Sequence, residues 1–332
     1  MFCSGCSTIR YLFQAGKGQL ELANRARPIP EVVADPRTPT RVKDLLSSID
    51  GIKKYGESQG LKATSNYQDY VHLDRYAAVW VVSACEPLQF KSKEWKFPIV
   101  GSFPYLGWFD RDNAVEFGKD LKKEGWDVDV RGAAAYSTLG WFRDAVLSTM
   151  IPPGDEALGE LVNVILHESV HATVYVSGQA FFNESVASFI ADRLTADYLK
   201  ARGAEAEKQL KAYLTSEELS KVRTERFHQA YGELALLYSS DRPTEAKLVE
   251  KEKLLTQLRA DLKYPREINN ATLVQFKTYN DGGADFERLY KACKGDWRGF
   301  VGSVLKLKPE SFEHPQQSDL KSVIDGLIQS GC

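Results

Sequence analysis

Apolar residues recur at helical spacing along most of the chain, and strand-like runs are confined to its first half. The spacing predicts an N-terminal helix over 7–26, which Pro28 and Pro30 end, and a second helix over 42–55. A continuous apolar run, two later runs rich in β-branched and aromatic residues, and an amphipathic stretch between those two predict three strands and a short helix. These strands span 77–84, 97–103 and 126–130, and the short helix spans 114–124.

After residue 155 the pattern is almost entirely helical. Two long, charged, heptad-like segments over 204–239 and 243–263 predict an antiparallel helical hairpin, because a polar break that ends in Pro243 separates them. The charges on this hairpin favour a solvated face over a binding surface for a partner. The other helices expected here span 182–201, 269–278, 286–293, 297–307 and 319–328.

This order of elements predicts an α+β fold, in which a small mixed or antiparallel sheet packs on a mainly helical body with a long C-terminal helical hairpin. With 332 residues, 43% of them hydrophobic, the chain can bury a full core. We expect residues 1–30 to form an N-terminal tether and helix, and residues 31–332 to form a single folded unit. Within that unit, 31–150 is the α/β part and 151–332 is the helical part.

Composition and charge exclude some classes of function. The net charge is −2 and 27% of the residues are charged, so bulk electrostatics gives no indication of a nucleic-acid partner. The sequence has no apolar run of about 18 residues, which excludes a conventional transmembrane helix.

The strongest chemical signal lies at residues 167–171, which read H-E-S-V-H and so match H-E-x-x-H. The preceding run, 156–166, is apolar enough to predict a buried helix that includes the motif, and in a helix positions i and i+4 face the same side. His167 and His171 can therefore bind one tetrahedral Zn²⁺, and Glu168 can act as general base on the water that the metal activates. A chance match is the alternative. However, the chain has only five histidines, and two buried ones would need a partner.

A third metal ligand is predicted twelve residues after His171, at Glu184. A short turn at 177–178 would let two antiparallel helices bring this carboxylate against the histidines and complete a His₂Glu site. Alternatively, Glu184 is an acid favoured by the positive end of a helix. Asn183 is interpreted as a helix N-cap that could also orient the site. Ser188 is interpreted either as a hydrogen-bond partner behind a zinc histidine or as a small packing residue.

The reaction also needs a donor that stabilises the developing oxyanion, and tyrosines occur on both sides of the motif. Tyr136 is our first candidate, and Tyr105 and Tyr175 are the others; each could instead be an ordinary core or surface aromatic. Tyr105 and Tyr136 lie in glycine-containing aromatic segments, which suit a wall where an extended substrate adds as a strand.

The N-terminal residues Gly5-Cys6-Ser7 are typical of a bacterial lipoprotein, in which the cysteine becomes the lipid-bearing first residue. We therefore expect Cys6 to be acylated and to tether the protein to a membrane surface. The charged and apolar segments that precede such a cysteine are missing, so we expect that the chain was shortened or its start assigned late. Alternatively, Cys3 and Cys6 form a chance C-x-x-C pair. The spacing of the five cysteines predicts no disulfide framework, and Cys85 is expected to be a buried free thiol.

With these motifs in view, the chain resembles the gluzincin metallopeptidases and, more closely, a bacterial family of predicted aminopeptidases that are often lipoproteins. The resemblance implies a single zincin-like unit, with His167, His171 and Glu184 as metal ligands and Glu168 as the catalytic residue. The matching segments extend over nearly the whole chain: Gly5–Ser7, Gln14–Leu20, Arg27–Ile29, Trp95–Gly101, Tyr136–Phe142, His167–His171, Phe182–Ala187 and Asn269–Ala271.

The sequence departs from this family at Lys96 and Ser102, where relatives tend to have cysteines. A disulfide between those two positions is therefore excluded in this chain. The interval between His171 and Glu184 is also shorter than in the best-known gluzincin aminopeptidases, which weakens any transfer of their specificity. An aminopeptidase needs an acid that holds the free α-amine, and Glu86 is our candidate for it.

Together these signals predict a peptidase with one Zn²⁺ per chain, most simply an aminopeptidase, that acts on a peptide or protein substrate. Its expected location is the periplasmic side of the bacterial cell envelope, with a lipid anchor in the outer membrane. The alternatives are an envelope endopeptidase and a non-catalytic, zinc-binding lipoprotein that binds a partner. Glu168 favours catalysis, because a structural zinc site needs ligands but no base.

Overall fold

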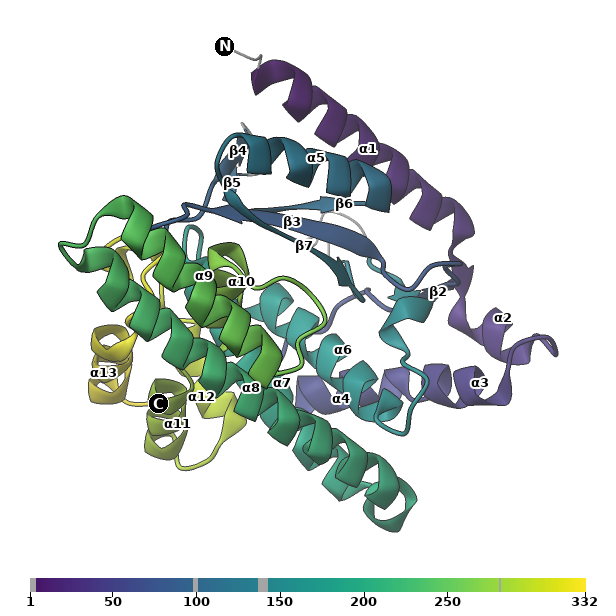
Figure 1. Cartoon of the computed structure of the whole chain (residues 1–332). Coiled ribbons are helices and arrows are strands. Elements are labelled where there is room, and N and C mark those ends of the chain that lie inside the picture. Colours follow the sequence, from purple (N-terminus) through teal and green to yellow (C-terminus); the bar gives the residue numbers. More distant parts are fainter. Residues whose placement is uncertain (1–3, 98–100, 137–142, 281) are drawn as a thin grey trace. The chain divides into compact units, whose positions relative to one another are not determined.

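The computed structural model describes residues 4–97, 101–136, 143–280 and 282–332 (Figure 1). Helices dominate and the sheets are small, so the predicted α+β class is confirmed. The chain forms two compact units that interleave in sequence, whereas the predicted parts 1–30, 31–150 and 151–332 follow chain order. The first unit comprises Met1–Arg25, Asp74–Ala134 and Leu219–Lys277, and the second comprises Ala26–Leu73, Ala135–Glu218 and Thr278–Cys332.

The first unit is built on a three-stranded antiparallel sheet. Its central strand β3 (Val79–Cys85) is buried along its whole length, as the continuous apolar run predicts, and it pairs with β6 (Tyr105–Trp108) and β7 (Asp127–Ala133). Helices α5 (Arg111–Lys123) and α1 (Ser4–Arg25) accompany this sheet (Figure 1).

Gln14 and Tyr11 hold helix α1 against the edge of this sheet. The Gln14 amide donates to Gly107 O at 3.1 Å and accepts from Phe109 N at 3.0 Å. These bonds satisfy backbone groups at and just beyond the end of β6, an edge strand that would otherwise present unpaired polar groups. The predicted helix over 7–26 is confirmed as α1.

The prediction of one strand over 97–103 is wrong, because two short strands pair there as a hairpin. β4 (Trp95–Phe97) and β5 (Gly101–Phe103) pair antiparallel, and Lys96 lies directly opposite Ser102. Strand β4 ends at Phe97, and residues 98–100 lie outside the described residues. The two positions where the resemblance places cysteines are therefore cross-strand neighbours.

The predicted helical hairpin is confirmed. Helix α8 (Glu207–Ser239) runs from the second unit into the first, where it packs against α9 (Thr244–Asp261) through Phe227, Leu234, Leu255 and Leu258. Helix α10 (Asn270–Asn280) follows.

Asn270 ties the helical part of the first unit to its sheet. Its side-chain amide donates to Glu86 O at 2.8 Å and accepts from the Tyr238 hydroxyl at 2.7 Å, and its N–H donates to Asp127 Oδ2 at 2.9 Å. Lys251 is buried and also pairs with Asp127. The Asn-Asn-Ala segment that matches the family thus has a structural role in this unit.

The second unit contains three very short strands. β2 (Asp69–Val71) pairs antiparallel with β1 (Arg27–Pro28) and parallel with β8 (Val146–Leu147). The single helix predicted over 42–55 is wrong: α3 (Thr40–Ser47) and α4 (Ile49–Ser58) are separate, and the break is at Ser48. The Ser48 hydroxyl bonds to Leu45 O, an alternative to regular helix bonding that serine offers.

The rest of the second unit is helical. Its main pair is α6 (Ala157–Thr173) and α7 (Ala180–Ala201), and α4 packs on α6. An aromatic core that includes Phe182, Phe286 and Phe300 joins α7 to the C-terminal helices. The remaining helices are α2 (Ile29–Ala34), α11 (Gly283–Ala292), α12 (Trp297–Val304) and α13 (Lys321–Ser330), and the 3-10 turns are Ser148–Met150, Gly203–Ala206 and Pro309–Ser311. Within the described residues, no helix has both the length and the apolar composition needed to cross a membrane.

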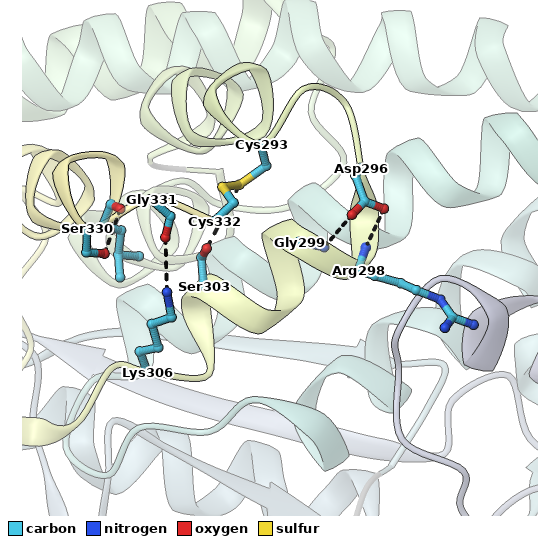
Figure 2. The surroundings of a disulfide bond; sticks show 10 residues. Cys293, Asp296, Arg298, Gly299, Ser303, Lys306, Ser330, Gly331 and Cys332 are labelled. Carbon is cyan, nitrogen blue, oxygen red and sulfur yellow. Dashed lines mark hydrogen bonds between the residues drawn. A yellow bond between two sulfur atoms is a disulfide. The ribbon is translucent and has the colours of Figure 1, made fainter.

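A disulfide joins Cys293 to Cys332, a pair that the spacing of the cysteines did not indicate (Figure 2). Cys293 follows α11, Cys332 follows α13, and their Cα atoms lie 5.4 Å apart although 39 residues separate them in sequence. Nearby, Lys306 Nζ donates to Gly331 O at 3.0 Å. Cys85 is a buried free thiol, as predicted.

Candidate metal centre

Helix α6 presents both histidines of the H-E-x-x-H segment on one side. Its core face is completely buried, and this burial fixes the rotation of the helix. The residues of that face are Leu161, Val162, Ile165, Leu166 and Val170. His167 and His171 are one turn apart, and their Nε2 atoms approach to 3.1 Å.

Helix α7 brings Glu184 to the same point. Its Oε2 atom lies 3.4 Å from Nε2 of His167 and 3.4 Å from Nε2 of His171, and all three side chains are largely buried. The prediction that a short turn brings this carboxylate against the histidines therefore agrees with the geometry.

Asn183 fixes the turn between the two helices. Its side chain accepts from Val176 N and donates to Val176 O, both at 2.8 Å, and it is 3% exposed. The prediction that Asn183 is the N-cap is wrong, because α7 begins at Ala180 and Gln179 occupies that position. Asn183 instead closes the turn from inside, directly before Glu184.

The three converging atoms have the spacing of a metal coordination sphere. In a tetrahedral zinc site with bonds of about 2.0–2.1 Å, neighbouring ligand atoms lie about 3.3–3.4 Å apart. The observed separations are 3.1, 3.4 and 3.4 Å. Among the residues that the structure describes, these are the only three His, Cys, Asp or Glu side chains grouped closely enough to hold a metal ion. The donor set and its spacing therefore fit zinc.

The charges of this group are strongly coupled. Burial alone lowers the pKa of His171, but the carboxylates of Glu184 and Glu168 outweigh it and the net pKa is raised above 6.5. Burial alone raises the pKa of Glu184, and hydrogen bonds with the two histidines outweigh it and bring the pKa to about 2. Glu184 is therefore an anion at neutral pH, as a metal ligand must be.

Two buried polar atoms at this site have no hydrogen-bond partner among the described residues: Glu168 Oε2 and His171 Nδ1. Such atoms are rare in folded proteins and need an explanation. The unpaired oxygen of Glu168, next in sequence to His167, is free to accept a hydrogen bond or a proton.

Sequence reasoning missed a polar row that continues from the ligands along the same helix pair. Asn163, one turn before His167, donates to Asp192 Oδ1 at 2.8 Å and to the Tyr213 hydroxyl at 3.0 Å. Burial raises the pKa of Asp192, and the hydrogen bond from Asn163 partly offsets this effect. The signal was present in the spacing, since Asp192 lies eight residues, or about two turns, after Glu184.

Two further carboxylates extend this row. Burial raises the pKa of Glu160 on α6, and burial with the nearby charges of Asp192 and Glu160 raises the pKa of Glu217 on α8 to about 7. Helix α8 can approach α6 closely because Gly159 faces the Tyr213 ring, where a Cβ atom would lie 2.7 Å from Tyr213 Cδ2.

The second unit also contains three other predicted site residues. Ser188 is half-buried one turn after Glu184, Tyr175 is 55% exposed beside Glu184, and Tyr136 is half-buried directly before residues 137–142, which lie outside the described residues. The roles of Ser188 and Tyr136 stay predictions.

Tyr105, Glu86 and Cys6 belong to the first unit, whereas the ligands belong to the second. Tyr105 is half-buried in β6, and Glu86 follows β3 and pairs with Lys91 at 3.3 Å. Cys6 lies near the start of α1. Substrate binding by Tyr105 and Glu86 and acylation of Cys6 stay predictions.

Comparison with known proteins identifies the family. A family model described as "Putative aminopeptidase" matches residues 10–318. No curated protein and no solved structure matches the chain significantly. Because the model covers nearly the whole sequence, the chain belongs to this aminopeptidase family, and its general class of function is that of a peptidase.

Proposed function

We propose that this protein is a zinc-dependent aminopeptidase in which His167, His171 and Glu184 hold the metal and Glu168 is the general base. The observation that carries the proposal is the convergence of two Nε2 atoms and one carboxylate oxygen within 3.1–3.4 Å. A mixed nitrogen and oxygen donor set with three protein ligands leaves a position open for water and favours zinc.

Zinc in this site supplies Lewis acidity and lowers the pKa of water toward 7. Glu168 accepts the proton of the attacking water through its unpaired Oε2, and then returns that proton to the leaving amine. Glu184 contributes negative charge to the ligand set, and Asn183 holds the backbone that carries it.

Two other functions compete with this proposal. An endopeptidase would use the same four residues, and family membership favours the aminopeptidase. A non-catalytic zinc protein would need the three ligands but no base, so the unpaired carboxylate of Glu168 argues against it.

We also propose that the protein acts in the bacterial cell envelope, where Cys6 carries a lipid. The Cys293–Cys332 disulfide supports an oxidising compartment, since disulfides are rare in the reducing cytosol. Mass spectrometry of the membrane fraction tests this: an acyl-modified Cys6 supports the location, and an unmodified Cys6 in a soluble fraction contradicts it.

Peptide hydrolysis by the purified, zinc-loaded protein tests the function. We expect cleavage by the unmodified protein and loss of at least about a thousandfold in kcat for Glu168→Gln, with zinc content unchanged. Glu57→Gln on the exposed side of α4 is the matched control and should keep full activity. Peptides with free and acetylated N-termini separate the two peptidase types, because an aminopeptidase cleaves only the free form. Zinc binding without cleavage of any peptide would contradict the proposal.

A further inference from the structure

Tyr67 has a backbone conformation that aromatic residues seldom adopt. It lies two residues before β2 with φ = 62°, in the left-handed region. Side chains with a Cβ atom are disfavoured there, and such a residue costs about 1–3 kcal/mol unless its surroundings impose the conformation. An outlier of this kind is a reason to ask what the side chain does.

Hydrogen bonds around Tyr67 impose this left-handed backbone conformation. Tyr67 N donates to Asp144 O at 2.7 Å, and Asp144 N donates back to Asn66 Oδ1 at 3.2 Å. From α4, Lys53 Nζ donates to Asn66 O at 2.7 Å. Three hydrogen bonds thus hold two consecutive residues and direct the Tyr67 side chain into the second unit.

There the ring is almost fully buried, at 4% exposure, and the carboxylates of Glu168 and Asp144 act on its hydroxyl. Burial and these two charges hold the pKa of Tyr67 well above its usual value. The phenol is therefore protonated at neutral pH and keeps a proton that it can donate.

This donor has nothing to bind in the protein itself. Within the described part of the chain, the Tyr67 hydroxyl makes no hydrogen bond, and Glu168 Oε2, whose charge acts on it, is fully buried without a partner. Burying one unpaired polar group already costs free energy. The buried Glu168 oxygen and the Tyr67 hydroxyl, an acceptor and a donor that the protein leaves without a hydrogen bond, are suited to receive the polar atoms of a ligand.

We propose that Tyr67 is a catalytic residue whose hydroxyl donates a hydrogen bond to the carbonyl oxygen of the scissile peptide bond, next to Glu168. This inference rests on the proposed function and adds its oxyanion donor. As the water oxygen bonds to the carbonyl carbon, the carbonyl π electrons move to the oxygen that Tyr67 stabilises. Glu168 takes the water proton, and the leaving amine receives it when the C–N bond breaks. Tyr67 keeps its own proton throughout.

The other tyrosines are less suited. Tyr175 is 55% exposed and lies beside Glu184, so its hydroxyl is hydrated and close to a metal ligand rather than to the base. A donor is effective when it is preorganised in a site that excludes water. Tyr67 has that property and Tyr175 does not.

Tyr67→Phe tests the inference, because it removes only the hydroxyl. We expect kcat to fall about 10²–10³-fold, as for the loss of one oxyanion donor, with KM within about threefold. Zinc content should be unchanged. The melting temperature should be nearly unchanged, because the hydroxyl that is removed makes no hydrogen bond within the protein. A merely structural tyrosine would show the opposite pattern, with lower stability and unchanged kcat.

Tyr70→Phe is the matched control. Tyr70 lies three residues further on in the chain, is buried in β2, and its hydroxyl is hydrogen-bonded to Ser148. We expect this variant to lose stability and to keep its kcat. Tyr136→Phe and Tyr175→Phe test the competing donors, and we expect each to lose less kcat than Tyr67→Phe.

A binding measurement makes the test independent of turnover. In the zinc-loaded Glu168→Gln background, calorimetry compares a phosphinic peptide, which mimics the tetrahedral state, with the corresponding uncleaved peptide. We expect Tyr67→Phe to weaken phosphinate binding at least tenfold and to leave peptide binding unchanged. The inference would be overturned if Tyr67→Phe kept both its phosphinate binding and its kcat, or if Tyr136→Phe or Tyr175→Phe lost more kcat than Tyr67→Phe. In either case, activity of the wild-type protein would still support the proposed function. A wild-type protein that neither cleaves peptides nor binds the phosphinate would overturn both.

Discussion

At the scale of single residues, the candidate site is formed by three side chains from two packed helices, α6 and α7. His167 and His171 are one turn apart on α6, and Glu184 reaches them from α7. These contacts alone do not set the position of Glu184, since the turn before α7 must also be fixed. Asn183 does this through both backbone groups of Val176.

We therefore expect Asn183→Ala to weaken zinc binding about 10–100-fold, as the loss of a residue that supports a ligand does. It should also lower the free energy of unfolding by about 2–3 kcal/mol, because the N–H and C=O of Val176 stay buried without partners. Zinc competition titration and chemical denaturation measure the two effects. Asn183→Asp keeps the acceptor and should lie between the two proteins. Wild-type zinc affinity in Asn183→Ala would show that the turn is fixed in another way.

Glu217 gives a pH-dependent prediction. Burial, together with Asp192 on α7 and Glu160 on α6, raises its pKa from 4.5 to about 7, and the Tyr213 ring lies in the same cluster. A carboxyl group whose pKa is raised by folding stabilises the folded state only while protonated, so this contribution is lost as the pH rises from 4.5 to about 7.

Glu217→Gln is neutral at every pH. We therefore expect its melting temperature to match that of the wild-type protein near pH 4.5 and to exceed it by roughly 2–5 °C at about pH 8. Calorimetry of both proteins at several pH values gives the difference. A difference in melting temperature that does not change with pH would mean that Glu217 titrates normally.

At the scale of elements, the long helices and the central strand follow from sequence periodicity, because burial of one face dominates their stability. The pattern predicts α6 with its two histidines, and the carboxylate of Glu184 on the helix after it. It does not predict β1, β2 and β8, which have two or three residues each and are too short for any periodicity. The break between α3 and α4 depends on the hydrogen bond from the Ser48 hydroxyl to Leu45 O. The left-handed conformation of Tyr67 depends on its hydrogen bond to Asp144, which is distant in sequence.

The hydrogen bonds of Asn270, which connect α10 to the strands of the first unit, are also tertiary contacts that sequence periodicity does not predict. Asn270→Ala would leave Glu86 O and the Tyr238 hydroxyl without their partner. We expect the free energy of unfolding to fall by about 2–4 kcal/mol. Hydrogen exchange should show the loss of protection first in α9 and α10.

Gln257→Ala is the matched control for that experiment, because its bond to Asp261 lies on the exposed side of α9. It should change the stability by less than about 0.5 kcal/mol. Equal effects of the two substitutions would show that Asn270 is not a structural tie.

At the scale of the whole molecule, the disulfide is the feature that the sequence could least predict. Pairing of Cys293 with Cys332 requires α11 and α13 to end at the same place, and this follows only from how the C-terminal helices pack (Figure 2). Family membership, by contrast, was accessible from motifs spread over nearly the whole chain.

Cys332→Ser removes this bond without altering the core. A disulfide that closes a loop of 39 residues stabilises the folded protein by up to about 4 kcal/mol, because it lowers the conformational entropy of the unfolded chain. We expect a lower melting temperature that no longer responds to dithiothreitol, while zinc content stays at the wild-type level. A melting temperature of the wild-type protein that is insensitive to the reductant would contradict this account.

The most direct test of the central claim is anomalous X-ray scattering from crystals of the zinc-loaded protein, with data collected on both sides of the zinc absorption edge. We expect one strong zinc peak per chain, bonded to Nε2 of His167, Nε2 of His171 and a carboxylate oxygen of Glu184, with Glu168 beside it and not bonded to it. A zinc ion bound elsewhere, or an empty site between these three side chains, would contradict it.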